Sequence, residues 1–279
     1  MPTVSIVIPN YNYARFSDRL FGSIAAQSMP LENVEIIFVD DGSSDNSLDK
    51  AAHWGARVPC ARFEIIALSR FGRPGPVRNH GLALAKGKYL FCMDPDDSLH
   101  PEYLARCVNT LEAAPHMDLV YTDYRENSLD GSREVRLPKF NQGLMRQQNI
   151  LLSSALYKRE LWDSGVRYRD NTEYEDWDYW IQSLIAGSRF VHIPELLYFY
   201  EIHNANFSHH ARKNDGRAKA QIVFNNPSFF HPLVQEWATG FMRGRLHSQA
   251  FQRGYIPSPN DVRTLLKTVE QRVFEVSGF

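Results

Sequence analysis

The sequence predicts an α/β protein with a mostly parallel sheet flanked by helices. Short runs rich in Val, Ile and Phe alternate with segments of helical pattern from the N-terminus to about residue 121. Such runs are typical of strands buried on both faces of a parallel sheet, with helices as the connections between them. Polar clusters follow three of the runs, at residues 9–12, 40–45 and 94–97. Because ligands of parallel sheets bind beyond the carboxyl ends of the strands, we expect one functional edge.

In the first half of the chain, each expected strand is a short run of apolar residues, several of them β-branched or aromatic. Pro101 supports the start of one helix, because proline is favoured at the first helical position. The expected strands are residues 4–8, 34–39, 63–68, 89–93 and 119–121. The expected helices are residues 16–27, 47–54, 81–85 and 101–113.

The second half of the chain is less regular. Residues 122–150 are polar and predict a surface excursion, after which the chain returns through residues 151–157. A helix is expected over residues 174–185 and a strand over residues 190–193. Beyond residue 205, apolar residues recur at helical spacing over residues 233–252 and 261–275. We therefore expect an α/β domain over residues 1–205 and a helical C-terminal extension over residues 206–279.

The composition is that of a soluble globular protein. The 279 residues are 43% hydrophobic and 23% charged, and the net charge is -1. Such a charge gives no global attraction to nucleic acid or to an anionic membrane, so an anionic ligand must be held by local groups. The three cysteines are an odd number without the spacing of a metal site, which favours a reducing compartment.

Neither a signal peptide nor a membrane-spanning segment is expected. The N-terminus lacks a basic segment followed by an apolar one. No window approaches the about 18 consecutive apolar residues of a transmembrane helix. We expect a cytoplasmic protein and leave open a peripheral position at the inner face of the membrane.

The acidic cluster Asp94-Pro95-Asp96-Asp97 follows the apolar run at residues 89–93. At about 4 Å, each unscreened pair of like charges costs about 4 kcal/mol at an effective dielectric constant of about 20. A divalent cation with oxygen ligands would offset this repulsion. The alternative is an acidic turn that precedes the helix beginning near Pro101.

The other two polar clusters suit a nucleoside. Pro9 and Tyr11 lie where the first strand ends, and an aromatic ring there can lie against a base; the alternative is a strand stop with a half-buried tyrosine. Asp40 or Asp41 can accept a hydrogen bond from a base N–H or a ribose hydroxyl. The following Gly42 and two serines also predict a turn and a helix cap, and the two interpretations are compatible.

Six short motifs follow one another along the chain. They are residues 5–12 (SIVIPNYN), 39–45 (VDDGSSD), 78–82 (RNHGL), 85–90 (AKGKYL), 94–97 (DPDD) and 174–177 (YEDW). Each motif alone is weak to moderate, whereas their order and spacing are specific. The set resembles the inverting glycosyltransferases of family 2, over roughly residues 3–205. The resemblance implies the Rossmann-like GT-A fold.

The resemblance also implies a set of donor-binding residues at the strand ends. They are Pro9, Tyr11, Asn12, Asp40, Asp41, Arg78 and Asp94. The guanidinium of Arg78 suits forked contacts with phosphate oxygens. Its alternative role is an ion pair with the acidic cluster.

A divalent cation, Mn²⁺ or Mg²⁺, is implied in the same way, held by Asp96, Asp97 and His203. The cation bridges the diphosphate and neutralises charge as the leaving group departs. Glu201 stands where the family often has arginine, two residues before the histidine, so phosphate contacts there are in question. A lone histidine is more often structural.

The motif at residues 174–177 opens a helix. The resemblance implies that Asp176 is the general base and that Glu175 supports it or touches the acceptor. The alternative is that both acids complement the helix dipole in the first turn. Trp177 and Trp180 could stack on sugar rings, but we expect at least one of them in the core.

The implied activity is metal-dependent transfer of a sugar from a nucleotide-diphosphate sugar, with uracil as the expected base. The expected acceptor is a hydroxyl of a glycan or lipid-linked glycan in polysaccharide biosynthesis. One alternative is a nucleotidyltransferase, although its Gly-rich, basic phosphate loop is missing from the first strand end. The other is a non-catalytic carbohydrate-binding relative.

No nucleic acid partner is expected. The C-terminal helices, with Trp237 and its basic neighbours, would either pack, form a homodimer contact or lie on a membrane surface.

Overall fold

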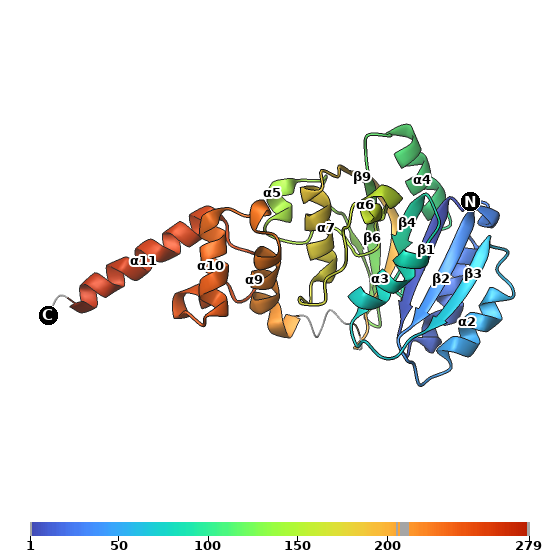
Figure 1. Ribbon diagram of the computed structural model, residues 1–279, viewed down its shortest axis with the longest axis horizontal. Coiled ribbons are helices and arrows are strands. Elements are labelled where there is room, and N and C mark those ends of the chain that lie inside the picture. Colours follow the sequence, from blue (N-terminus) through green and yellow to red (C-terminus); the bar gives the residue numbers. More distant parts are fainter. Residues whose placement is uncertain (1, 205, 207–211, 278–279) are drawn as a thin grey trace. The chain divides into compact units, whose positions relative to one another are not determined.

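The computed structural model describes residues 2–204, 206 and 212–277 (Figure 1). The chain divides into two compact units. The first contains Met1–Phe140, Leu151–Asp170 and Ala186–Asn204, and the second contains Asn141–Ile150, Asn171–Ile185 and Ala205–Phe279. The chain therefore passes between the units at several places, and the domain boundary expected after residue 205 stays a prediction.

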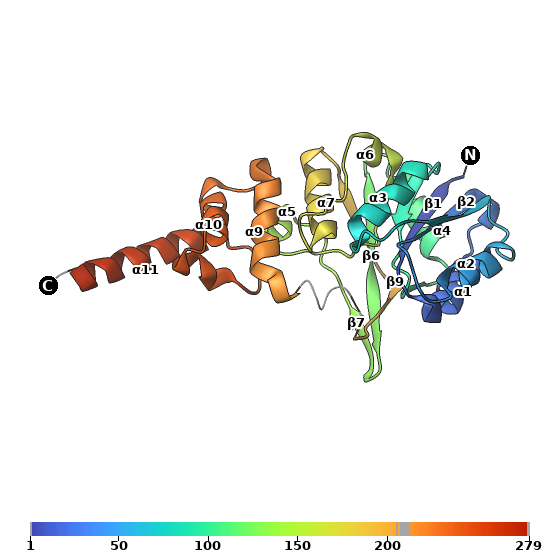
Figure 2. The same ribbon diagram turned by 60° about the horizontal axis from the view of Figure 1, so that its bottom comes forward.

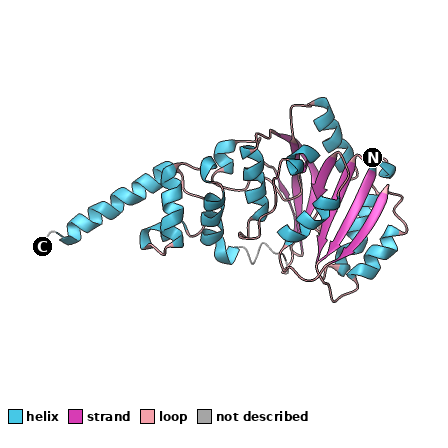
Figure 3. Cartoon of the chain, viewed as in Figure 1, coloured by secondary structure: helices cyan, strands magenta, loops and turns pink. Residues whose placement is uncertain are grey.

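The first unit is built on a mixed sheet (Figure 3), which has nine strands within the described residues. Along the sheet, the strand order is β3-β2-β1-β4-β8-β6-β9-β5, and β7 pairs with β6. The four strands β3, β2, β1 and β4 pair in parallel with one another, as do β6 and β9, while β8 runs antiparallel to both β4 and β6. The α/β class with a largely parallel sheet is thus confirmed. The strands are β1 (Val4–Asn10), β2 (Val34–Asp40), β3 (Arg62–Ala67), β4 (Tyr89–Cys92), β5 (Ser98–Leu99), β6 (Leu119–Ser128), β7 (Gly131–Val135), β8 (Leu156–Lys158) and β9 (Phe190–Glu201).

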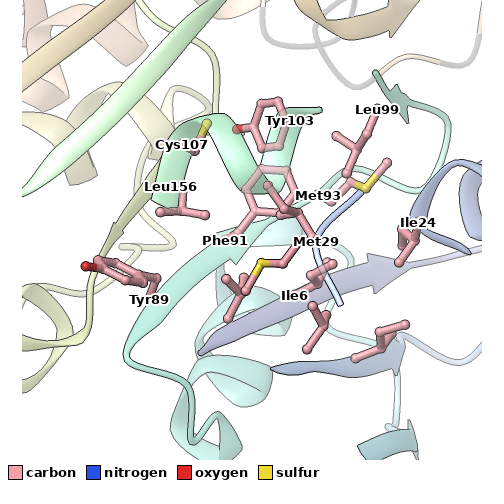
Figure 4. Packing of buried hydrophobic residues seen from close by; sticks show 14 of the residues in the cluster. Ile6, Ile24, Met29, Tyr89, Phe91, Met93, Leu99, Tyr103, Cys107 and Leu156 are labelled. Carbon is pink, nitrogen blue, oxygen red and sulfur yellow. The ribbon is translucent and has the colours of Figure 1, made fainter. Parts of the chain in front are cut away.

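Helices cover both faces of the parallel strands. Successive side chains of a strand point to opposite faces, so Ile6 and Val7 of β1 face different layers. Ile6 belongs to the main core cluster with residues of α1 (Ser17–Ala25), α2 (Ser47–Gly55) and α4 (Tyr103–Ala113). Figure 4 shows part of this cluster, including Ile6, Phe91 and Tyr103. On the other face, Val7 packs against Gly81 of α3 (Pro74–Leu84).

Several elements of the first unit differ from expectation, and β9, expected over residues 190–193, extends to Glu201. Helix α3 begins at Pro74 rather than near residue 81, because Pro-Gly-Pro occupies its first turn, where proline is tolerated. Residues 122–135 are not irregular: β6 continues to Ser128 and turns into β7, and these two strands form the ribbon seen in Figure 2. The other edge of β6 pairs with β9 as far as Asn127. This ribbon is polar on both sides, so the sequence lacks the apolar alternation that marks a half-buried strand.

The second unit is helical. Asp178 of α7 (Glu175–Ile185) is fully buried, and its Oδ1 accepts hydrogen bonds from Asn225 and Asn226 at 3.1 Å and 2.7 Å. These bonds join α7 to the end of α9 (Asp215–Asn225). The other α-helices of this unit that the structure describes are α5 (Gln142–Met145), α10 (Pro232–Met242) and α11 (Pro259–Ser277).

Trp237 of α10 shows how the C-terminal helices use their aromatic residues. It is buried, and its indole N–H donates to the carbonyl of Ser248 at 2.9 Å. This side chain packs inside the unit instead of facing a membrane. In the described part of the chain, the helices are too short or too polar to cross a bilayer.

Candidate active site

The carboxyl ends of β1, β2 and β4 lie next to one another, because β1 pairs in parallel with the other two strands. Asn10 at the end of β1 is in register with Asp40 at the end of β2. Its side-chain amide donates to Asp40 Oδ1 at 2.8 Å. The three polar clusters expected at one edge of the sheet are therefore brought together.

The turn after β2 is held by Asp40 and Asn12. Asp40 accepts hydrogen bonds from the backbone N–H and the hydroxyl of Ser43, at 2.8 Å and 2.5 Å. Asn12 has a left-handed backbone with φ 59°, and its Oδ1 accepts from the N–H of Ser44 at 2.7 Å. Asparagine tolerates this conformation better than most residues. Both side chains predicted to bind the donor thus also shape the loop between them.

Asp41 fastens the loop that follows β3. Its two carboxylate oxygens accept from the backbone N–H groups of Phe71 and Gly72 at 2.6 Å and 2.9 Å. The adjacent Arg70 places its guanidinium 3.1 Å from the centroid of the Tyr11 ring. Arginine and aromatic rings attract one another in this geometry. Sequence reasoning missed Arg70; its signal was a basic residue shortly after a strand expected at the same edge.

Arg78 and Asp94 form a partly buried ion pair. Arg78 is only 3% exposed, and its Nη2 lies 2.6 Å from Asp94 Oδ1. The hydroxyl of Ser153 donates to the other oxygen of Asp94 at 3.0 Å. The structure thus contains the ion pair that was the alternative to a phosphate contact for Arg78. A guanidinium with five donors can still engage a second anion.

Asp97 is the most enclosed member of the acidic cluster, at 1% exposed. Its Oδ2 accepts from the hydroxyl of Tyr198 at 2.6 Å, and its Oδ1 accepts from the N–H of Glu201 at 2.9 Å. Burial, with the nearby charges of Asp96 and Asp94, raises the pKa of Asp97 well above its usual range. Asp97 therefore ties the end of β9 to the cluster.

Asp96 faces His203. Its Oδ2 lies 2.9 Å from His203 Nε2, and burial and the charge of Asp94 raise the pKa of Asp96 to about 7. The long β9, which ends at Glu201, carries the histidine to this position. A carboxylate held among like charges in a buried setting is stabilised by any cation that reaches it.

Two arginines from the start of the first unit surround this pair. Arg15 Nη2 lies 3.4 Å from His203 Nδ1, and the ring of Phe16 stacks on the imidazole with centroids 4.9 Å apart. Arg19 pairs with Glu201 at 2.7 Å and donates to the backbone carbonyl of Asp96. Glu201 is thus balanced by a cation of α1. Sequence reasoning missed both arginines, because nothing local links residues 15 and 19 to residues 201 and 203.

The implied cation ligands fit a metal in part. Within the residues that the structure describes, no three acidic, His or Cys side chains are arranged as a metal site. Asp96 and His203 do converge, and a carboxylate with an imidazole suits Mn²⁺. Asp97 Oδ2 and Oδ1 accept hydrogen bonds from Tyr198 and Glu201, and its role as a metal ligand stays a prediction.

Glu175 and Asp176 lie in the second unit, at the start of α7. Asp176 Oδ2 accepts from the side-chain amide of Asn149 at 2.8 Å, and Oδ1 accepts from the N–H of Trp177 at 2.8 Å. Glu175 is mostly buried, at 7% exposed. Sequence reasoning missed Asn149, which lies in a segment without an evident pattern.

The tryptophans of α7 belong to the interior. Trp177 and Trp180 are both buried, and the indole of Trp177 donates to the carbonyl of Met145 at 2.8 Å. The expectation that at least one of them is a core residue is confirmed.

Comparison with known proteins identifies the family. Residues 5–171 match the model of glycosyl transferase family 2. The chain belongs to this family. A relative from Rhizobium meliloti (strain 1021), the succinoglycan biosynthesis protein ExoO, is 27% identical over 270 residues, which are 90% of this chain and 76% of ExoO. Chondroitin synthase from Pasteurella multocida (strain Pm70) is 26% identical over 241 residues. That match covers 85% of this chain but only 24% of the synthase.

Solved structures of other proteins share the fold. The structure of S. aureus TarS 1-349 in complex with UDP-GlcNAc has a TM-score of 0.68 at 19% identity, covering 91% of this chain and 74% of that one. The mannosyltransferase PcManGT from Pyrobaculum calidifontis, in complex with GDP-Man and Mn²⁺, has a TM-score of 0.63 at 18% identity. That comparison covers 98% of this chain and 81% of the other. The family 2 glycosyltransferase has the α/β fold of these neighbours.

Proposed function

We propose that this family 2 glycosyltransferase moves a sugar from a nucleotide-diphosphate sugar, with UDP as the nucleotide, to a hydroxyl of a glycan or lipid-linked glycan. The transfer inverts the anomeric configuration and is assisted by Mn²⁺ or Mg²⁺. The observation that carries this proposal is the acidic cluster at the end of β4, where Asp96 is buried among like charges and faces His203. Such a group is stabilised by a cation and, through it, by a diphosphate.

The relatives support the choice of substrates. TarS binds UDP-GlcNAc in its structure, and the mannosyltransferase binds GDP-Man with Mn²⁺. The curated relatives include a succinoglycan biosynthesis protein and a chondroitin synthase, whose names refer to polysaccharides. A nucleotide-sugar donor and a glycan acceptor are therefore the substrates that we assign.

In the proposed donor site, Tyr11 offers its ring to the base, and Pro9 shapes the strand end beside it. The backbone held by Asn12, Asp40 and Asp41 forms the wall around the nucleoside, since these side chains fix the loops after β2 and β3. Arg70, which lies over Tyr11, either moves aside or takes the second face of the base.

The diphosphate end of the donor would be held by other residues. Asp96 and His203 would hold the cation, while Asp97 and Asp94 fix the geometry of the cluster through Tyr198, Glu201 and Arg78. When bound, the metal neutralises charge that develops on the departing diphosphate. Arg15, beside His203, places a further positive charge near this group.

Asp176 is the proposed general base. The acceptor oxygen attacks the anomeric carbon in line, the bond from this carbon to the diphosphate breaks, and Asp176 takes the proton of the attacking hydroxyl. Glu175 supports the base or contacts the acceptor. General-base assistance of this kind contributes about 10²–10⁴-fold to a rate. Positioning and electrostatic stabilisation supply the rest.

The substitution Asp176→Asn tests this assignment. It keeps the shape of the side chain and removes its basicity, so transfer should fall by about 10²-fold or more. Binding of UDP with Mn²⁺, measured by thermal shift or calorimetry, should stay near that of the wild type. Glu173→Gln is the matched control, because Glu173 lies three residues earlier and is bonded only to the amide of Asn214 at 3.3 Å among its described contacts. Full transfer activity in Asp176→Asn would remove this residue from the base role.

A further inference from the structure

Asn149 donates a side-chain hydrogen bond to the carboxylate of Asp176. Its amide N–H donates to Asp176 Oδ2 at 2.8 Å, and the two residues are far apart in sequence but lie in the same compact unit. The other oxygen, Oδ1, accepts from the N–H of Trp177 at 2.8 Å. Each oxygen of the Asp176 carboxylate thus accepts a hydrogen bond from a fixed donor, and these two bonds set the plane of the carboxylate.

The segment that carries Asn149 is held on both sides. Arg146 donates through Nε to the carbonyl of Phe229 at 2.9 Å and lies over the Phe229 ring. The carbonyl of Gln147 accepts from the N–H of Ile256 at 2.8 Å. Ile150, the next residue after Asn149, is buried at 3% exposed. The backbone at residue 149 is thus fixed by neighbours that are not part of α7.

The chemistry of an amide suits this place. A neutral N–H donor stabilises the ionised form of a carboxylate, which is the form that can take a proton. It also fixes the plane of the carboxylate without adding a charge that would pair with the base and weaken it. A carboxylate at position 149 would do the reverse, because two acids at hydrogen-bond distance share one proton.

We propose that Asn149 is the positioning residue of the general base: its amide orients the Asp176 carboxylate toward the acceptor hydroxyl and keeps it ionised. This role rests on the proposed function and extends it to a residue outside the Glu-Asp pair. Asn149 touches the base and not the reacting atoms, so its removal should slow the chemical step and leave donor binding intact.

Two substitutions of Asn149 test the proposal together. Asn149→Ala removes the donor, and kcat should fall about 10- to 100-fold, a part of the about 10²–10⁴-fold that a general base supplies. The donor KM should stay within about twofold, since uniform binding is unchanged. Asn149→Asp keeps the size of the side chain and should move the acidic limb of the pH–rate profile to higher pH by about one unit or more. Gln148→Ala, at the exposed neighbouring position, is the matched control and should behave as the wild type.

These measurements distinguish a failure of the Asn149 proposal from a failure of the proposed function on which it rests. If Asn149→Ala and Asn149→Asp both keep the wild-type kcat and pH profile while Asp176→Asn is inactive, the role of Asn149 is overturned and the proposed function stands. If Asp176→Asn keeps full activity, the base assignment fails and the role of Asn149 fails with it. Should Asn149→Ala unfold, as shown by circular dichroism, the isosteric Asn149→Asp decides alone through its pH profile.

Discussion

Lys219 is a buried ammonium in α9, at 0% exposed. Its Nζ lies 3.1 Å from Asp215 Oδ2 and 3.3 Å from the carbonyl of Phe251. Burial lowers the pKa of Lys219 below its usual value, and the hydrogen bond and charge of Asp215 oppose this shift only in part. The Asp215 carboxylate also accepts hydrogen bonds from the Tyr174 hydroxyl at 2.8 Å and the Gly254 N–H at 3.0 Å. It would therefore still have hydrogen-bond donors if Lys219 were replaced.

This lysine makes stability depend on pH in one direction. The folded state releases the proton at lower pH than the unfolded state, so between the two pKa values the unfolded chain binds more protons and stability rises with pH. Relative to Lys219→Met, the free energy of unfolding of the wild type should therefore rise as pH increases toward 10.5. Urea unfolding of both proteins at about pH 7 and about pH 10 measures this. A difference between them that is the same at both pH values would contradict the expected shift.

For the charged residues at the strand ends, the sequence predicted their position in the fold but not their hydrogen-bond partners. Asp40, Asp94 and Asp97 were correctly expected near the carboxyl ends of buried strands, because the apolar runs stop there. Their hydrogen-bond partners were not predictable, since Tyr198 bonds Asp97 across 101 positions of sequence. Whether a carboxylate reaches a ligand or closes an internal bond depends on such distant donors.

At the scale of the elements, α3 packs tightly against the sheet at Gly81. A Cβ on this residue would overlap the side chain of Val7 and lie 3.0 Å from Val39 Cγ2. Both valines are fully buried and stiff at χ1, so neither can move aside at low cost. Gly81 therefore sets the distance between α3 and the strands β1 and β2, whose ends carry the candidate donor site.

Replacing Gly81 with alanine should destabilise the first unit despite the better helix propensity of alanine. Overpacking of a filled interior typically costs about 1–3 kcal/mol. Gly22→Ala in α1 is the control, because a Cβ there would meet only Trp54 at 3.9 Å, an ordinary contact. That substitution should be neutral or stabilising by up to about 1 kcal/mol. Chemical unfolding measures both, and equal stability of the two variants would contradict tight packing at Gly81.

The pattern of apolar residues determined which strands could be predicted from the sequence. The strands β1, β2 and β4 are continuous apolar runs and were expected within one or two residues of their ends. The ribbon of β6 and β7 was missed beyond residue 121, because its residues are polar and partly exposed on both sides. Its strands are stabilised by pairing and by cross-strand ion pairs such as Arg133 with Glu126, which leave no apolar pattern.

For the molecule as a whole, a bound donor should appear as added stability. A ligand at about 100 times its Kd stabilises the folded state by about 2.7 kcal/mol. Each kcal/mol shifts the melting temperature by about 2–4 °C for a chain of this size class. UDP with Mn²⁺ should therefore raise the melting temperature by about 5–10 °C.

Removing the metal should cancel most of that rise and stop sugar transfer. EDTA added to the UDP complex is the test, with excess Mn²⁺ as the reversal. Asp96→Ala should lose the metal-dependent part of the shift. An equal shift in metal-free buffer, or transfer that persists there, would contradict the cation proposal.

The general class of the molecule could be predicted from the sequence, whereas the long-range contacts that group its segments could not. The order of short motifs indicated the family, and the apolar runs indicated the sheet. The grouping of residues 141–150 and 171–185 with the C-terminal helices depends on contacts such as Thr172 with Ala218 and Ile256 with Gln147. These bonds join segments that share no local pattern.

The bond from Ile256 to Gln147 bears on how far this polypeptide could be trimmed. A version cut back to the strands and their covering helices would lose the anchors at Phe229 and Ile256 that steady the stretch bearing Asn149. By the proposed function, such a truncated version would keep the residues assigned to the nucleotide and lose the support of the residue assigned to orient the general base. The C-terminal segment therefore supports the position of Asn149, a residue far earlier in the chain.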